Sequence, residues 1–87
     1  MHGVVTTVTI TDPESSESEL RERVVPGVKQ LPGFVTGYWL RKGNDGMSFV
    51  IFDSEDAANQ AAERIPSVVP ESVELQGVEV REVVANA

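Results

Sequence analysis

Hydrophobic residues recur at two kinds of spacing along the chain, and the alternating kind defines four short segments. Residues 4–10 are all β-branched, which favours an extended strand over a helix. Residues 34–42 and 47–52 are apolar at most positions, and the Gly-Asn-Asp-Gly segment between them tolerates the positive φ angles of a hairpin turn. In residues 73–84 the alternation breaks at Gly77, which predicts a β-bulge. The sequence therefore predicts four strands.

The first segment with helical spacing follows the first strand and runs to about residue 31. Its apolar side chains form one stripe of a 3.6-residue period, at Leu20, Val24, Val28 and Leu31. Two starts fit the sequence: Asp12 can cap the helix with Pro13 in its first position, or Ser16 can open a capping box with Glu19. A proline inside a helix removes a hydrogen bond, so Pro26 and the glycine after it predict a kink.

A second helix is predicted after the third strand, with Asp53 or Ser54 as its cap. Its apolar stripe consists mainly of small side chains, at Ala58, Ala61, Ala62 and Ile65. Such a stripe lets a helix lie close to a sheet, so we expect a small cavity or none beneath it. Pro66 is expected to end this helix, and residues 67–72 to form a loop.

The resulting order of elements is β-α-β-β-α-β in one domain that spans residues 1–87. Two split βαβ units with right-handed crossovers predict a ferredoxin-like α+β fold: a four-stranded antiparallel sheet with both helices on one face. The spatial order would be 4-1-3-2. Charged residues fall on the two outer strands, as protection of sheet edges requires, at Arg41, Lys42, Glu79, Arg81 and Glu82.

Both faces of this sheet are predicted to be apolar. On the third strand Phe49 and Ile51 point one way, and Val50 and Phe52 point the other. The helices cover one face, and the other would exceed the apolar patch that soluble monomers usually expose. The simplest closure is a homodimer in which two sheets pack face to face.

Composition and charge exclude several classes of partner and site. The net charge of −7 argues against nucleic acid and anionic membranes, which need clustered Lys and Arg. Cysteine is absent, so no disulfide, thiolate metal site or cysteine nucleophile is possible. No apolar run approaches the ~18 residues that a membrane span requires, and we expect a cytoplasmic protein.

The order of elements is accompanied by two informative segments, P-G-F-V-T-G-Y-W after the first helix and S-F-V-I-F-D-S-E-D-A-A between the third strand and the second helix. Together they resemble the dimeric α/β-barrel family that includes the antibiotic-biosynthesis monooxygenases. The resemblance covers nearly the whole chain. It implies that two sheets form a barrel in a homodimer and that a pocket lies between each sheet and its helices.

The first hypothesis is a homodimer that binds a small apolar or aromatic ligand, and we expect neither a cofactor nor a metal. The alternative is a cofactor-independent monooxygenase that acts on an aromatic substrate. A third hypothesis is a non-catalytic association module whose interior is filled by side chains. Heme-degrading members of the family use an Asn, a Trp and a helical His ligand. Here neither predicted helix contains a histidine, and Trp39 lies on a hairpin strand.

Three residues of the second strand are the candidate ligand-binding residues. Tyr38 and Trp39 are adjacent and therefore face opposite sides, so that one can line a pocket and the other a subunit interface. Arg41 shares the face of Trp39 and can anchor an acidic ligand or form a salt bridge with the acidic surface. The sole histidine, His2, is expected to be frayed, and the acidic Asp53–Asp56 segment to cap a helix rather than bind a cation.

Overall fold

The computed structural model describes residues 1–87 and contains four strands and two helical segments. The strands are β1 (His2–Ile10), β2 (Phe34–Lys42), β3 (Asp45–Phe52) and β4 (Val73–Glu82). The first helical segment joins β1 to β2 and consists of α1 (Pro13–Glu19), a π-helical stretch η1 (Leu20–Val24) and α2 (Val25–Lys29). The second, α3 (Glu55–Val68), joins β3 to β4.

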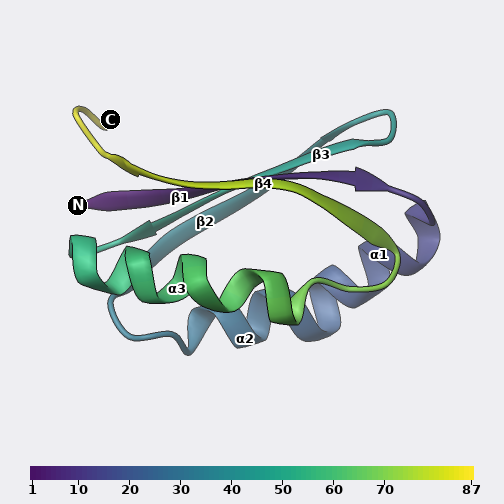
Figure 1. Ribbon diagram of the computed structural model, residues 1–87, viewed down its shortest axis with the longest axis horizontal. Helices are drawn as coiled ribbons and strands as arrows, with labels where there is room; N and C mark the ends of the chain where they lie inside the picture. The colour runs from purple at the N-terminus through teal and green to yellow at the C-terminus, as the bar shows by residue number, and fades with distance from the viewer.

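All neighbouring strands are antiparallel, and their order across the sheet is β2-β3-β1-β4. This is the predicted 4-1-3-2 order, and it confirms the ferredoxin-like fold. Figure 1 shows the sheet as one layer with both helical segments on the same side of it. The opposite face of the sheet has no covering element (Figure 1). No helix is both long enough and apolar enough to cross a lipid bilayer.

The strand register explains which side chains face the helices. The β1–β4 register shifts where Thr7 pairs with Gly77 and Val8 pairs with Leu75, so one extra residue of β4 bulges there. This confirms the bulge predicted at Gly77. A second shift, between Phe34 and Thr36 in β2, was not predicted. Before this shift the helix-facing residue of β2 is the even-numbered Phe34. After it the helix-facing residues are odd-numbered, and they include Trp39.

The first helical segment starts at the earlier of the two predicted positions. The Asp12 side chain accepts a hydrogen bond from the Ser15 backbone N–H at 3.3 Å, and Pro13 occupies the first turn. The interruption predicted at Pro26 takes the form of the π-helical stretch η1, which lies immediately before α2. A proline cannot donate the usual helical hydrogen bond and crowds the carbonyl four residues earlier, and a wider turn relieves that crowding.

The prediction that Pro66 ends the second helix is wrong, because α3 continues to Val68. Pro66 lies in the last turn, where its missing N–H removes a single helical bond and its fixed φ suits the helix. The Ser67 hydroxyl also donates to the Arg64 carbonyl at 2.8 Å. The start of α3 is one of the two that were predicted: the Ser54 hydroxyl accepts from the Ala57 N–H at 3.2 Å.

The tightest part of the core lies at one end of the sheet, below the first half of α3. It consists of Val4, Val50, Phe52, Ala58 and Ala61, all nearly inaccessible to solvent. The Phe52 ring meets Phe34 edge-on with centroids 6.4 Å apart. Because these residues close the end of the sheet where β1 begins, any cavity must lie towards the end where β1 stops.

Gly33 connects α2 to β2 in a conformation that other residues avoid. Its φ is +79°, and a Cβ atom there would lie 2.8 Å from the Ala57 Cβ. Its carbonyl accepts a hydrogen bond from the Asp53 N–H at 2.8 Å, so this turn ties the first helical segment to the start of α3. Glycine is required here for both its φ angle and its lack of a side chain.

We predict that Gly33→Ala lowers the free energy of unfolding by about 2 kcal/mol or more, because a left-handed conformation and a steric clash are combined. Gly27→Ala is the matched control: a Cβ placed there would have no atom within 4 Å, and a helical alanine gains about 0.5–1 kcal/mol over glycine. Urea unfolding of both variants checks this. Equal effects of the two substitutions would contradict it.

Candidate functional site

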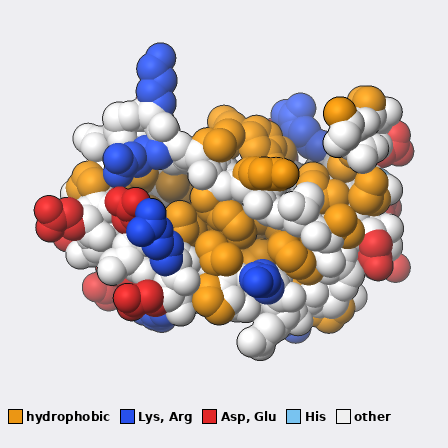
Figure 2. Space-filling model, turned by 180° about the vertical axis from the view of Figure 1, so that it is seen from behind, with side chains coloured by type: hydrophobic (Ala, Val, Ile, Leu, Met, Phe, Trp, Pro, Cys, Tyr) orange, Lys and Arg blue, Asp and Glu red, His pale blue; other side chains and the backbone are white.

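A cavity of about 320 Å³ lies between the sheet and the helical segments, at the end of the sheet away from the tight core. Thirteen of its 21 lining residues are hydrophobic. Figure 2 shows hydrophobic side chains gathered in the middle of the face behind that of Figure 1, with acidic side chains towards its two ends. The cavity therefore offers an apolar interior that is open to solvent at its mouth.

The floor of the cavity is formed by two rows of paired residues across the sheet. Thr6 and Trp39 both pair with Ser48, so these three side chains lie side by side on the helix-facing surface. In the next row Val8 and Arg41 both pair with Gly46. A Cβ at Gly46 would lie 2.7 Å from Val8 Cγ2, so the missing side chain at residue 46 makes room for the Val8 side chain.

The roof is formed by the first helical segment and the last turns of α3. Leu20 and Val24 of η1 and Ile65 of α3 line the cavity. None of these side chains is fully buried, and the whole first helical segment contains no buried residue. The first part of its apolar stripe, Leu20 and Val24, therefore borders the cavity, whereas Val28 and Leu31 also pack against the core. π-helical stretches occur frequently at functional sites.

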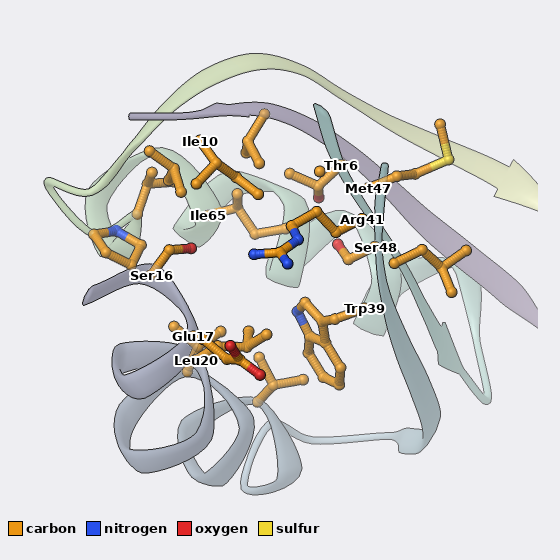
Figure 3. A pocket seen from close by; sticks show the side chains of 18 of the residues that line it. Thr6, Ile10, Ser16, Glu17, Leu20, Trp39, Arg41, Met47, Ser48 and Ile65 are labelled. Atoms are coloured by element: carbon orange, nitrogen blue, oxygen red, sulfur yellow. The ribbon is translucent and has the colours of Figure 1, made fainter. Parts of the chain in front are cut away.

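Trp39 and Arg41 reach into the cavity from β2, as Figure 3 shows. A Cβ at Gly37 would lie 3.0 Å from the Trp39 indole, so this glycine lets the ring lie along the strand. Arg41 is exposed at the mouth. It takes part in none of the three ion pairs of the molecule, so the salt bridge considered for it from the sequence is not formed. The structure thus brings two of the three candidate residues together.

Tyr38 lies away from this cavity. Its side chain is 62% exposed on the face of the sheet that the helices do not cover, where it pairs with Phe49. Leu40 and Met47 form the next pair along β2 and β3, and both are exposed. In the close-up of Figure 3 the Met47 side chain points away from the cavity. Tyr38 is therefore placed to contact another molecule through the open face of the sheet.

Thr6 and Ser48 are polar groups on the cavity floor that were not predicted from the sequence. Thr6 is only 7% exposed, and its hydroxyl oxygen is buried without a hydrogen-bond partner. Leaving such a group unsatisfied costs about 1–3 kcal/mol. The signal in the sequence was present: Thr6, Gly46 and Ser48 interrupt strand faces that are otherwise apolar.

The cavity volume of about 320 Å³ agrees with the small cavity that was one of the two expected outcomes. The small side chains Ala58 and Ala61 do bring the first half of α3 close to the sheet. They do not control the distance between the sheet and η1, which belongs to the other helical segment. The cavity opens on that side.

His2 is also placed differently from the frayed position that was expected. It is part of β1, where it pairs with Phe52 and Glu82, and its side chain is 19% exposed. Its Nε2 lies 3.3 Å from a Glu55 carboxylate oxygen. It does not line the cavity. No group of three or more His, Asp or Glu side chains is arranged to hold a metal ion.

Comparison with known proteins supports the fold. The sequence matches no protein-family model, and no curated protein is significantly similar to it. Among solved structures, the chain is similar to the heme-degrader MhuD from Mycobacterium tuberculosis, determined with two hemes bound in its active site. The TM-score is 0.51 and the sequence identity 24%, over 97% of this chain and 98% of that chain. The likeness supports, at the level of fold, the resemblance to the dimeric α/β-barrel proteins.

We predict that Thr6→Val raises the free energy of unfolding of the ligand-free protein by about 1 kcal/mol, because it removes an unpartnered buried hydroxyl and keeps the side-chain shape. Urea unfolding checks this, with Thr7→Val, at the neighbouring position on the opposite face of β1, as the matched control. A loss of stability specific to Thr6→Val would show that the hydroxyl already has a partner.

Proposed function

We propose that the protein binds a small molecule with an apolar or aromatic body in the cavity beside Trp39. The observation that carries this proposal is the preformed cavity of about 320 Å³ with a largely hydrophobic lining. Pockets for small molecules usually measure about 300–1,000 Å³ and combine an apolar lining with a few polar groups. The cavity is at the lower end of this range, which favours a ligand with one or two rings or a medium-length alkyl chain.

Heme is a poor fit to the residues of this cavity, although MhuD binds two hemes. Protein ligands of heme iron are His, Cys, Met or Tyr. The lining contains no His, Cys or Tyr, and its single methionine, Met47, points away (Figure 3). We therefore propose a ligand that needs no axial iron ligand from the protein.

A cofactor-independent monooxygenase is the second candidate function. Such an enzyme must take a proton from its aromatic substrate, and a side chain that does so works best where water is excluded. Glu17 is the only acidic side chain in the lining; it is exposed and paired with Arg21 at 2.9 Å. Because no buried acid or base faces the cavity, we propose binding as the function and catalysis as the alternative.

We also propose that the protein is a homodimer formed through the open face of the sheet. The apolar side chains on this face lie in adjacent rows of β1, β3 and β2, at Val5, Tyr38, Leu40, Met47, Phe49 and Ile51. Tyr38, Leu40 and Met47 are each at least 40% exposed in the single chain. Monomers rarely leave a patch of this kind in water. Leu40 and Met47 also border the cavity, so the proposed interface lies next to the binding site of each copy.

We propose that the protein acts in the cytoplasm as one domain of residues 1–87, without nucleic acid or a membrane as partner. The formal net charge of −7 supports the absence of polyanionic partners.

For the dimer, we predict sedimentation at micromolar concentration as a particle of twice the 9.4 kDa chain mass. Tyr38→Glu should convert it to monomers, because each copy would then bury a negative charge in the interface. Val84→Glu, at a position 87% exposed in the C-terminal tail, is the control and should remain dimeric. A wild-type particle of 9.4 kDa would contradict the proposal.

For the binding site, we predict that decan-1-ol shifts the emission of Trp39, the only tryptophan, to shorter wavelengths and saturates at one molecule per chain. The shift follows from the displacement of water from the indole. Ser48→Phe should abolish the response by filling the cavity floor, whereas Ser18→Phe, on the exposed side of α1, should not. Circular dichroism verifies folding of both variants. An undiminished response in a folded Ser48→Phe protein would place the ligand elsewhere.

A further inference from the structure

We propose that the ligand carries a carboxylate, which Arg41 binds at the mouth of the cavity while the apolar body lies between the sheet and η1. This inference rests on the proposed binding function and names the chemical class of the ligand. It follows from the position of Arg41 in the cavity lining and from its N–H donors, which have no acidic partner in the protein.

Arg41 is the cationic side chain of the cavity lining. The ion pairs of the molecule are His2–Glu55, Arg21–Glu17 and Arg81–Glu79, so Arg41 has no acidic partner. The acid that lines the same cavity, Glu17, is held by Arg21 at 2.9 Å. Other cationic side chains of the protein are unpaired as well, but Arg41 is the one that lines the cavity. The five N–H donors of Arg41 are therefore available to a bound molecule.

The surroundings of Arg41 separate a polar end from an apolar end of the site. Arg41 pairs across the sheet with Gly46, and the Val8 and Ile10 side chains fill the place where a side chain of residue 46 would lie. Figure 3 shows the guanidinium in the middle of the lining side chains, with Trp39 to one side and Leu20 on the helical segment. Arg41 is exposed, whereas Ser48 and Val50 on the floor are buried. A ligand with an acidic head would place this head at the mouth and remain hydrated there.

The guanidinium is well suited to a carboxylate because its planar fork matches the two oxygens. An alternative role for Arg41 is to cover apolar surface with its methylene groups while the charge stays in water. The two roles differ in one measurable respect. Only the first distinguishes a carboxylic acid from the corresponding neutral amide.

The test is isothermal titration calorimetry of the full chain with three acid–amide pairs: 2-naphthoate and 2-naphthamide, 4-phenylbutanoate and 4-phenylbutanamide, and decanoate and decanamide. At least one acid is expected to bind about tenfold more tightly than its amide, the usual size of a hydrogen bond to a charged group. Arg41→Gln should remove this preference and leave the amide affinity unchanged. Lys42→Gln is the matched control: it makes the same change in charge at the adjacent residue, whose side chain faces the other way, and should keep the preference.

Each outcome decides one of the two proposals. If amides and acids bind equally to the wild type, or if Arg41→Gln keeps the preference, the carboxylate inference is wrong and the binding function stands. If Lys42→Gln removes the preference as fully as Arg41→Gln, the effect is one of net charge and the inference is also wrong. If no member of any pair binds, the proposed binding function fails as well.

Discussion

The structure depends on one constraint: its four-stranded sheet carries apolar side chains on both faces, and the chain has only two helical segments to cover them. Both segments lie on the same face (Figure 1). They do not cover it evenly. Below the first half of α3 the sheet is sealed by Val4, Phe52 and Ala58, which are almost completely buried. Towards the end of β1 the apolar side chains of η1 face a cavity instead.

Because of this uneven cover, one end of the sheet has a closely packed core and the other end has a cavity that can accept a ligand. Close packing against small side chains gives the α3 end its density, and cavities within such packing are costly. The first helical segment buries no residue completely and is interrupted by a π-helical stretch. A ligand that fills the cavity would bury apolar surface of this segment that is not buried in the protein alone. The uncovered face of the sheet offers a second apolar surface, which the proposed dimer would bury independently.

Much of the fold could be predicted from the sequence, because strand alternation and turn residues are local signals. The strand order, the Gly77 bulge and the capping positions follow from them. The shared face of Trp39 and Arg41 follows from their spacing on one strand. The family resemblance implied a pocket between the sheet and its helices, but the size of the cavity could not be predicted, because it depends on the distance between η1 and the sheet, which no local pattern encodes. The end of α3 was misjudged because Pro66 was read without its position in the last turn.

The most direct test of this account is to locate a bound ligand by intermolecular nuclear Overhauser effects to methyl groups. In a complex with decanoate, the account predicts contacts from the alkyl chain to the methyl groups of Leu20, Val24 and Ile65, which line the cavity. Contacts to Val5 and Ile51, on the open face of the sheet, would contradict it. In that case the ligand would occupy the surface that we assign to the second subunit.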